Sequence, residues 1–356
     1  MPKTVETTDG NIPLGSLESP FKTGPDALII KVPSQQGNRM ISTAKTWFNY
    51  AACLIFLPIS VTGRIIEILL ALKQRISTKT SSLEGKVVFI TGASSGLGEA
   101  LARQFYKEGC RLIIASRRYS ELERVRNQLI GSSYRKGIVY PPVIIQLDLE
   151  NPDSLADKMK TVLGVYGHVD ILVNNAGISY RGEVISTSAE VDAKLMNVNY
   201  FGTVSLTKGL LPSMIERKSG HIVMIGSLQA KLAIPFRSAY AASKHALQAF
   251  SDSLRAEVKM HDINVTVINP GYIKTCLSVN ALTGDGNKYG KMDETTESGT
   301  DPAVAAEYIV QAIKNKTEEV QLCSIFYRLA VLIRVLYPKL FFLMMERRAA
   351  KARKTQ

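Results

Sequence analysis

Residues 86–108 constrain the fold of this chain more than any other stretch. Residues 86–91 (KVVFIT) form an apolar strand pattern, residues 92–98 (GASSGLG) follow at once, and residues 99–108 have a helical pattern. Glycines between a strand and a helix let the backbone approach a pyrophosphate, which the helix N-terminus then binds. No G-K-[ST] follows, which excludes a nucleotide-hydrolysing phosphate loop. The stretch predicts a dinucleotide site; the alternative is a glycine-rich turn without a ligand.

Two arginines follow the second predicted strand. Residues 111–116 (RLIIAS) end where, in a dinucleotide-binding unit, an Asp or Glu would bind the ribose 2′-hydroxyl. Arg117 and Arg118 occupy that place instead, and a guanidinium is well shaped to bind a 2′-phosphate. We therefore predict NADP(H) rather than NAD(H) as the cofactor. The alternative is that both arginines are solvated surface charges, since exposed arginine is common.

The region as a whole alternates between predicted strands and predicted helices. Further apolar strand patterns stand at residues 143–148, 171–173, 221–227 and 265–269, with helical patterns between them. This alternation predicts an α/β fold, a single Rossmann-type doubly wound parallel sheet with helices on both faces. Ligands of such folds bind beyond the carboxyl ends of the strands. The residues at those ends are Gly92, Arg117, Asp148, Asn174, Ser227 and Pro270.

A serine, a tyrosine and a lysine have the chemistry for carbonyl–alcohol interconversion. Ser227 ends a predicted strand, while Tyr240 and Lys244 stand one turn apart on the predicted helix 238–260. A phenol with a reference pKa of about 10 is a poor acid or base at neutral pH, and a nearby ammonium lowers that pKa. Ser227 would hydrogen-bond the oxygen that Tyr240 protonates. Taken alone, a Y-x-x-x-K pair is more often an ordinary surface pair.

These motifs, in this order, resemble the classical short-chain dehydrogenase/reductase (SDR) family across residues 83–320. TGxxxGxG stands at 91–98, NNAG at 174–177, an asparagine at 199, a serine at 227, YxxxK at 240–244 and PG at 270–271. Within the family, the chain looks most like the membrane-associated group called SDR family member 7 and 7B. That group adds acyl- or alkyl-dihydroxyacetone phosphate to the candidate substrates.

The resemblance implies a role for each matching residue. Tyr240 would be the acid and base, Lys244 would lower its pKa and hold the nicotinamide ribose, Ser227 would orient the carbonyl, and Asn199 would hold a water of the proton relay. Asp148 would contact the adenine and Thr275 the carboxamide. Besides Tyr240 and Lys244, the residues expected to bind the cofactor are Thr91, Gly92, Ser94, Ser95, Gly96, Leu97, Gly98, Ser116, Arg117, Arg118, Asp148, Leu149, Asn175, Ala176, Gly177, Pro270, Gly271, Ile273 and Thr275.

The N-terminal region predicts a tail followed by a membrane anchor. Residues 1–45 have no sustained periodicity, whereas residues 46–63 carry no charge and apolar character resumes to residue 72. A membrane span needs about 17–25 residues, so 46–72 is interpreted as an anchor, with a buried core helix as the alternative. Its flanks carry slightly more basic residues on the C-terminal side, which favours a cytosolic catalytic domain. We expect the endoplasmic reticulum membrane, with the peroxisome as the alternative.

Two further segments lie near the C-terminus. Residues 272–300 are polar and glycine-rich and are expected to form a substrate lid or a disordered insertion. Residues 322–356 are apolar, interrupted by three cations and ended by a basic run, which predicts an amphipathic segment on a membrane surface. The alternative is a helix that packs between subunits of a homo-oligomer. The Rossmann-type NADP-binding catalytic domain is accordingly expected at 83–321.

The distribution of charge excludes nucleic acid as an expected partner. The net charge is +13, but residues 84–321 hold 27 basic and 25 acidic residues, so the excess lies at the two apolar ends. Four scattered histidines form no ligand-spaced cluster, and we expect no metal. The sequence predicts a membrane-associated NADP(H)-dependent oxidoreductase that interconverts a carbonyl and a secondary alcohol on an apolar lipid ketone, steroid or retinoid. The alternative is a vestigial cofactor-binding sensor or scaffold.

Overall fold

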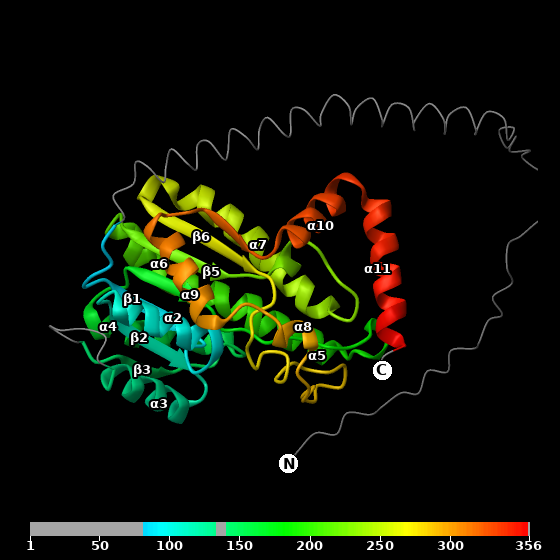
Figure 1. Cartoon of the computed structure of the whole chain (residues 1–356). Coiled ribbons are helices and arrows are strands. Elements are labelled where there is room, and N and C mark those ends of the chain that lie inside the picture. Colours follow the sequence, from blue (N-terminus) through cyan, green and yellow to red (C-terminus); the bar gives the residue numbers. More distant parts are fainter. Residues whose placement is uncertain (1–80, 133–139, 355–356) are drawn as a thin grey trace, which may run out of the picture. The chain divides into compact units, whose positions relative to one another are not determined.

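A computed structural model describes residues 81–132 and 140–354. Its centre is a parallel seven-stranded sheet of order β3-β2-β1-β4-β5-β6-β7 (Figure 1). Every strand pair is parallel, which confirms the doubly wound sheet that the sequence predicts. The strands are β1 Val87–Thr91, β2 Arg111–Ser116, β3 Val143–Gln146, β4 Ile171–Asn174, β5 Gly220–Ile225, β6 Ile263–Pro270 and β7 Glu319–Leu322.

Helices cover both faces of the sheet. Alternate residues of β1 point to opposite sides: Val88 and Ile90 pack with α2, α3 and α9, while Val87 and Phe89 pack with α4, α6 and α7. Each face therefore has its own apolar core. The helices are α2 Gly96–Lys107, α3 Tyr119–Ile130, α4 Leu155–Tyr166, α5 Ala189–Met196, α6 Gly202–Glu216, α7 Ser238–Val258, α8 Glu294–Glu297, α9 Pro302–Lys314, α10 Ile325–Leu336 and α11 Pro338–Arg353.

The strand order reverses between β2 and β4, which both pair with β1. Chain segments leaving the carboxyl ends of β1 and β4 diverge at this point and leave a crevice, the usual ligand site of doubly wound sheets. The glycine loop after β1 and residues 175–177 after β4 both start here. The sheet topology thus brings together motifs that are more than 80 residues apart in the sequence.

Two elements differ from the sequence-based expectations. β7 was not predicted, because it is an edge strand, paired only with β6, and its residues Glu-Val-Gln-Leu are half-buried and show no continuous apolar run. The helical pattern between the strands predicted at 171–173 and 221–227 is interrupted by a π turn at Asn197–Phe201, which separates α5 from α6. Such single-turn insertions are common at functional sites, and hydrophobic periodicity does not reveal them.

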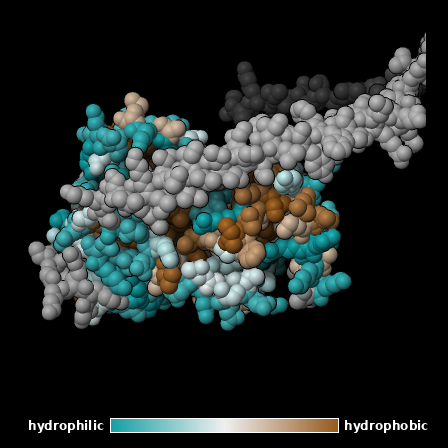
Figure 2. All heavy atoms as spheres, turned by 45° about the horizontal axis from the view of Figure 1, so that its top comes forward, coloured by the Kyte–Doolittle hydropathy of each residue, from teal (hydrophilic) through white to brown (hydrophobic). Residues whose placement is uncertain are grey.

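The C-terminal segment forms a helical hairpin, α10 and α11, that turns at Tyr337–Pro338. Many of its apolar side chains are exposed, and hydrophobic residues gather on this part of the surface in Figure 2. In residues 81–132 and 140–354, no helix has both the length and the apolar character that crossing a membrane requires. The anchor predicted at 46–72 and the tail predicted at 1–45 lie outside the described residues.

Candidate active site

The glycine loop is held tightly between β1 and β4. Gly92 and Gly96 have positive φ angles of 65° and 58°, which side chains with a Cβ rarely adopt. A Cβ on Gly98 would collide with the Gly92 carbonyl oxygen and the Asn175 side chain. The loop is thus compact because its glycines let backbone approach backbone, and the N-terminus of α2 is left facing the crevice.

Thr91 and Asn175 fasten the loop to the neighbouring strand. The Thr91 hydroxyl accepts hydrogen bonds from the backbone N–H groups of Asn175 and Ala176, both at 3.1 Å. In return the Asn175 amide donates to the carbonyl oxygens of Thr91 at 2.9 Å and Gly92 at 3.2 Å. These four bonds fix the two sides of the crevice relative to each other, and sequence motifs alone did not predict this reciprocal pattern.

The two arginines after β2 have different partners. Arg118 donates hydrogen bonds to the hydroxyls of Ser94 and Ser95 in the glycine loop, at 3.1 and 2.9 Å. Arg117 instead lies 3.8 Å from a Glu150 carboxylate oxygen, in a largely exposed pair that is worth little. Of the two, Arg118 is the one placed against the loop where phosphates would bind.

A cavity of about 810 Å³ runs along the carboxyl ends of the strands. It is lined by every residue that the sequence predicts to bind cofactor, including Ser116, Asp148, Leu149, Pro270, Gly271, Ile273 and Thr275. Ser227, Tyr240 and Lys244 also line it, whereas Asn174 and Asn199 do not. Asn174 is buried behind the wall and donates to Thr207 at 3.0 Å. The fold therefore gathers the predicted cofactor residues and three of the four predicted catalytic residues around one space.

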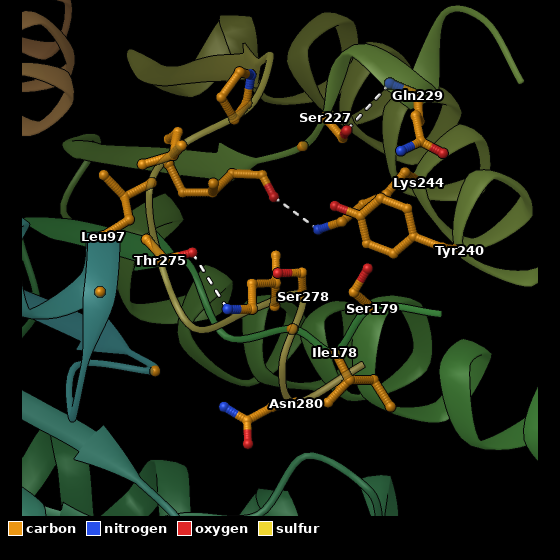
Figure 3. A pocket seen from close by; sticks show the side chains of 18 of the residues that line it. Leu97, Ile178, Ser179, Ser227, Gln229, Tyr240, Lys244, Thr275, Ser278 and Asn280 are labelled. Carbon is orange, nitrogen blue, oxygen red and sulfur yellow. Dashed lines mark hydrogen bonds between the residues drawn. The ribbon is translucent and has the colours of Figure 1, made fainter. Parts of the chain in front are cut away.

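Ser227, Tyr240 and Lys244 are close together at one end of this cavity (Figure 3). Each is more than nine-tenths buried. Ser227 follows β5, and its hydroxyl accepts a hydrogen bond from the Gln229 N–H at 3.1 Å. The Lys244 ammonium donates to the Ile225 carbonyl at 2.9 Å and lies 5.8 Å from the centre of the Tyr240 ring. An ammonium has three donors, so two remain for a group in the cavity.

Burial dominates the ionisation of this group. It raises the pKa of Tyr240, while a hydrogen bond from the Ser227 hydroxyl and the positive charge of Arg181 act in the opposite direction. Burial also lowers the pKa of Lys244 to about 8. The spacing of Tyr240 and Lys244 predicts that Lys244 lowers the Tyr240 pKa. In the protein without cofactor, the groups that lower this pKa are Ser227 and Arg181. Desolvation of two neighbouring ionisable groups cannot be read from a four-residue spacing.

Asn199 lies in the π turn and is 1% exposed. Its amide donates to the Ile178 carbonyl and the Ser243 hydroxyl, both at 3.0 Å, and its oxygen accepts from the Ile178 N–H at 2.9 Å. Both donors are thereby used. A water of the proton relay expected from the family would have to bind at the remaining acceptor position of the side chain or at the main chain.

Two residues of the site escaped the sequence analysis. Gln229 lines the cavity near Ser227, and its Oε1 atom is buried without a hydrogen-bond partner among the described residues. Arg181 is 9% exposed and carries the charge that acts on Tyr240. Neither belongs to a short motif. Arg181 follows the NNAG motif closely in the sequence, and this position could have drawn attention to it. Without that context, a charged residue in this segment is expected to be solvated.

The cavity fits a dinucleotide on grounds of its own. It combines a glycine loop and helix N-terminus for a pyrophosphate, a buried ammonium with free donors, and an unpartnered Gln229 oxygen. Arg118 and the hydroxyls of Ser94 and Ser95 supply donors at the loop. The residues present therefore suit a nicotinamide dinucleotide extended along the crevice.

Comparisons with known proteins decide the family. The model of the short chain dehydrogenase family matches residues 86–285. The chain belongs to the SDR family. It is 50% identical over 313 residues to a dehydrogenase/reductase SDR family protein 7-like from Anopheles gambiae, covering 88% of this chain and 98% of that protein. It is 51% identical over 270 residues to SDR family member 7B from Bos taurus, covering 76% and 83% of the two chains.

A solved alcohol dehydrogenase has a similar fold. The alcohol dehydrogenase from the archaeon Thermococcus sibiricus, complexed with 5-hydroxy-NADP, superposes with a TM-score of 0.58 at 28% identity. The match covers 68% of this chain and 98% of that one. As an SDR, the chain is expected to use a nicotinamide dinucleotide, and the resemblance to the member 7 and 7B group that the sequence indicated is confirmed.

Proposed function

We propose that this chain is an NADP(H)-dependent oxidoreductase that interconverts a carbonyl and a secondary alcohol on an apolar substrate. The observation that carries the proposal is the burial of Ser227, Tyr240 and Lys244 at one end of a cavity whose other residues suit a dinucleotide. A bound nicotinamide supplies or accepts the hydride. A sensor or scaffold would need the glycine loop but not these three side chains.

The protein residues divide the remaining work. In reduction, the Tyr240 hydroxyl donates a proton to the carbonyl oxygen, and in oxidation its phenolate accepts the proton of the alcohol. The Ser227 hydroxyl donates a hydrogen bond to the same oxygen and orients it. Lys244 holds the ribose with the donors that the Ile225 carbonyl leaves free. Water must leave the site for these interactions to reach full strength, and the surrounding burial favours this.

The cofactor preference follows from the second strand. No carboxylate stands directly after β2, and Arg118 reaches over the glycine loop, which favours a 2′-phosphate and hence NADP(H). The complex of the related archaeal enzyme with an NADP derivative is consistent with this preference. Arg117 stays a second candidate for the 2′-phosphate, although it also forms an ion pair with Glu150.

The substrate is proposed to be largely apolar. The cavity lining includes hydrophobic side chains, among them Leu228, Leu232, Ile234, Phe341 and Met345. Residues 272–300 contribute Leu277 and Leu282 and would act as the lid. Lipid ketones, steroids and retinoids fit this lining, and acyl- or alkyl-dihydroxyacetone phosphate combines such a chain with a polar head.

The test is NADPH oxidation by the purified full chain against a panel of lipid ketones, with NADH in parallel. We expect turnover of at least one apolar ketone with NADPH preferred. Tight NADPH binding without turnover of any ketone or alcohol would instead support the sensor.

Membrane association is part of the proposal. The hairpin exposes apolar residues beside the basic run 347–354, a combination typical of helices in a membrane interface. We propose residues 46–72 as the anchor, 83–321 as the catalytic domain and the endoplasmic reticulum or peroxisome as the location, with the domain in the cytosol.

The full chain should resist carbonate and salt washes. A chain beginning at Leu83 should stay bound at low salt and be released by high salt, because screening weakens its basic contacts.

A further inference from the structure

A chain of polar side chains runs from the backbone of Ser227 to the edge strand β7. The Ser227 N–H donates to the Asn269 Oδ1 atom at 3.1 Å. The Asn269 Nδ2 atom donates in turn to the Gln248 Oε1 atom at 2.9 Å and lies 3.5 Å from a carboxylate oxygen of Glu319 on β7. Asn269 and Gln248 are buried. None of Asn269, Gln248 and Glu319 lines the cavity of about 810 Å³, the main cavity, so these side chains can reach a substrate only through Ser227.

A glycine lets the Asn269 side chain approach the end of β5. A Cβ on Gly226 would collide with the Asn269 Oδ1 atom. The Gly226 N–H donates to the Ile268 carbonyl at 2.7 Å, and the next N–H along the chain, that of Ser227, donates to the Asn269 side chain. Two successive hydrogen bonds therefore hold the end of β5 against β6, and the second bond depends on the Asn269 amide.

The surrounding acceptors determine which way the Asn269 amide faces. A carboxylate only accepts hydrogen bonds, whereas an amide has a donor atom and an acceptor atom. The Gln248 Nε2 atom donates to the Asp252 carboxylate at 2.9 Å and lies 3.4 Å from Glu319, so the Gln248 oxygen faces Asn269. The Asn269 nitrogen thus has two acceptors, Gln248 and Glu319, and the Asn269 oxygen is left for the Ser227 N–H.

Glu319 also holds the turn that begins at Ser227. Ser227 caps the 3-10 helix Leu228–Ala230, and Lys231 follows this helix. The Lys231 ammonium lies 3.0 Å from the Glu319 Oε2 atom. Glu319 is therefore connected to Ser227 by two routes, one through the Asn269 amide and one through the ion pair with Lys231.

We propose that Asn269, oriented by Gln248 and Glu319, is a positioning residue for the Ser227 hydroxyl. A hydroxyl that orients a substrate carbonyl must be held to within about 0.5 Å, which requires support from the residues around it. A buried amide is costly unless it is hydrogen-bonded, and the fold alone would be served by an apolar residue, such as the neighbouring Ile268 of β6. The inference rests on the proposed function only for the role of Ser227 in the reaction.

The first test needs neither substrate nor turnover. The full chain is labelled with isotope-labelled serine, and the amide proton resonance of Ser227 is assigned by its loss in Ser227→Ala. In Asn269→Leu we expect this resonance to move upfield, because the amide proton loses its acceptor. Thr266→Val is the matched control, since Thr266 is equally buried on β6 but its hydroxyl binds the His221 ring and the Thr317 carbonyl. A resonance that stays in place in Asn269→Leu, or that moves equally in Thr266→Val, overturns the proposal.

Glu319→Gln tests the orientation of Asn269 in a variant that keeps the buried amide. The Glu319 side chain is 30% exposed, so the substitution is compatible with folding. A glutamine amide places a donor beside either Lys231 or Asn269, and the Ser227 resonance should move in the same direction as in Asn269→Leu, by a smaller amount. Glu318→Gln removes the same charge from the exposed residue directly before β7 and should leave the resonance in place. No movement in Glu319→Gln, or equal movement in the two glutamate variants, overturns the proposal.

The second test asks whether Asn269 acts on the reaction through Ser227. The kcat for reduction of a lipid ketone with saturating NADPH is measured for both single variants and for the double variant. Ser227→Ala should lower kcat about 10²- to 10³-fold, as the loss of an oxyanion donor does, and Asn269→Leu roughly tenfold or more through misplacement of Ser227. The double variant should then have the kcat of Ser227→Ala alone.

The outcomes separate the positioning role from the proposed function. If the effects of Ser227→Ala and Asn269→Leu on kcat multiply in the double variant, the defect of Asn269→Leu is structural and the proposal is overturned. If no ketone is turned over by the unaltered chain, the proposed function fails, while the Ser227 resonance still decides whether Asn269 holds the serine.

Discussion

The two halves of the main cavity are built in different ways. On the cofactor side, the glycine loop, Thr91 and Asn175 are joined mainly by backbone hydrogen bonds and by contacts that only glycine permits. On the substrate side, the wall consists of side chains from distant segments, such as Arg181, Leu282 and Arg348. Each part of the first half belongs to a short sequence motif, whereas the second half depends on long-range packing alone. A short motif can therefore predict the cofactor side but not what the enzyme acts on.

Tyr240 belongs to neither half alone, and removing its hydroxyl gives the largest expected effect. Tyr240→Phe should lower kcat about 10²- to 10⁴-fold, the usual contribution of general acid–base catalysis, because Tyr240 is the group proposed to exchange the proton. NADPH affinity, measured by fluorescence titration, should be retained, since the cofactor side is built separately. Retention of more than about a tenth of kcat would remove Tyr240 from the role.

Gly98→Ala attacks the cofactor side where backbone contacts are closest. The new Cβ would meet the Gly92 carbonyl and the Asn175 amide, so the loop must move, at a cost of about 1–3 kcal/mol in the free energy of unfolding. We expect NADPH affinity to fall at least about tenfold. Gly164→Ala in α4 is the control, because its Cβ would meet no atom within 4 Å. If both substitutions left NADPH affinity unchanged, the loop would not be the pyrophosphate site.

The same contrast explains how much the sequence could predict. The alternation of strands and helices predicted the parallel sheet, and glycine spacing predicted which loop lies at its switch point, since both depend on local patterns. The edge strand β7 and the π turn at Asn197–Phe201 were missed, because tertiary pairing and a single inserted residue leave no period in the sequence. The Arg181–Asp293–Arg237 cluster joins residues up to 112 positions apart. No spacing rule reaches that far.

The preference for NADPH over NADH tests the roles of two adjacent arginines on the cofactor side. Arg118→Asp should lower the ratio of kcat/KM with NADPH to that with NADH by roughly tenfold or more, because a carboxylate would oppose the 2′-phosphate beside Ser94 and Ser95. Arg117→Asp should have the smaller effect, since Arg117 is largely exposed and near Glu150. Steady-state rates with both cofactors give the ratios. A larger effect at Arg117 would reverse the assignment of the two residues, and no effect at either would exclude both from the site.

The smallest expected effect is a shift in the pH dependence of alcohol oxidation, which follows the pKa of Tyr240. Alcohol oxidation requires the Tyr240 phenolate, so kcat/KM for oxidation rises with pH through the pKa of that group. The charge of Arg181 lowers this pKa, and its removal in Arg181→Gln should therefore move the half-maximal pH upward. Arg181→Lys keeps the positive charge, so its half-maximal pH should lie close to that of the unaltered chain. A purely structural defect would lower the rate at every pH without moving the profile. Melting temperatures of both variants control for the loss of the Asp293 ion pair, which leaves a buried carboxylate with Arg237 alone. A profile for Arg181→Gln that coincides with that of the unaltered chain would show that Arg181 does not act on the Tyr240 phenol.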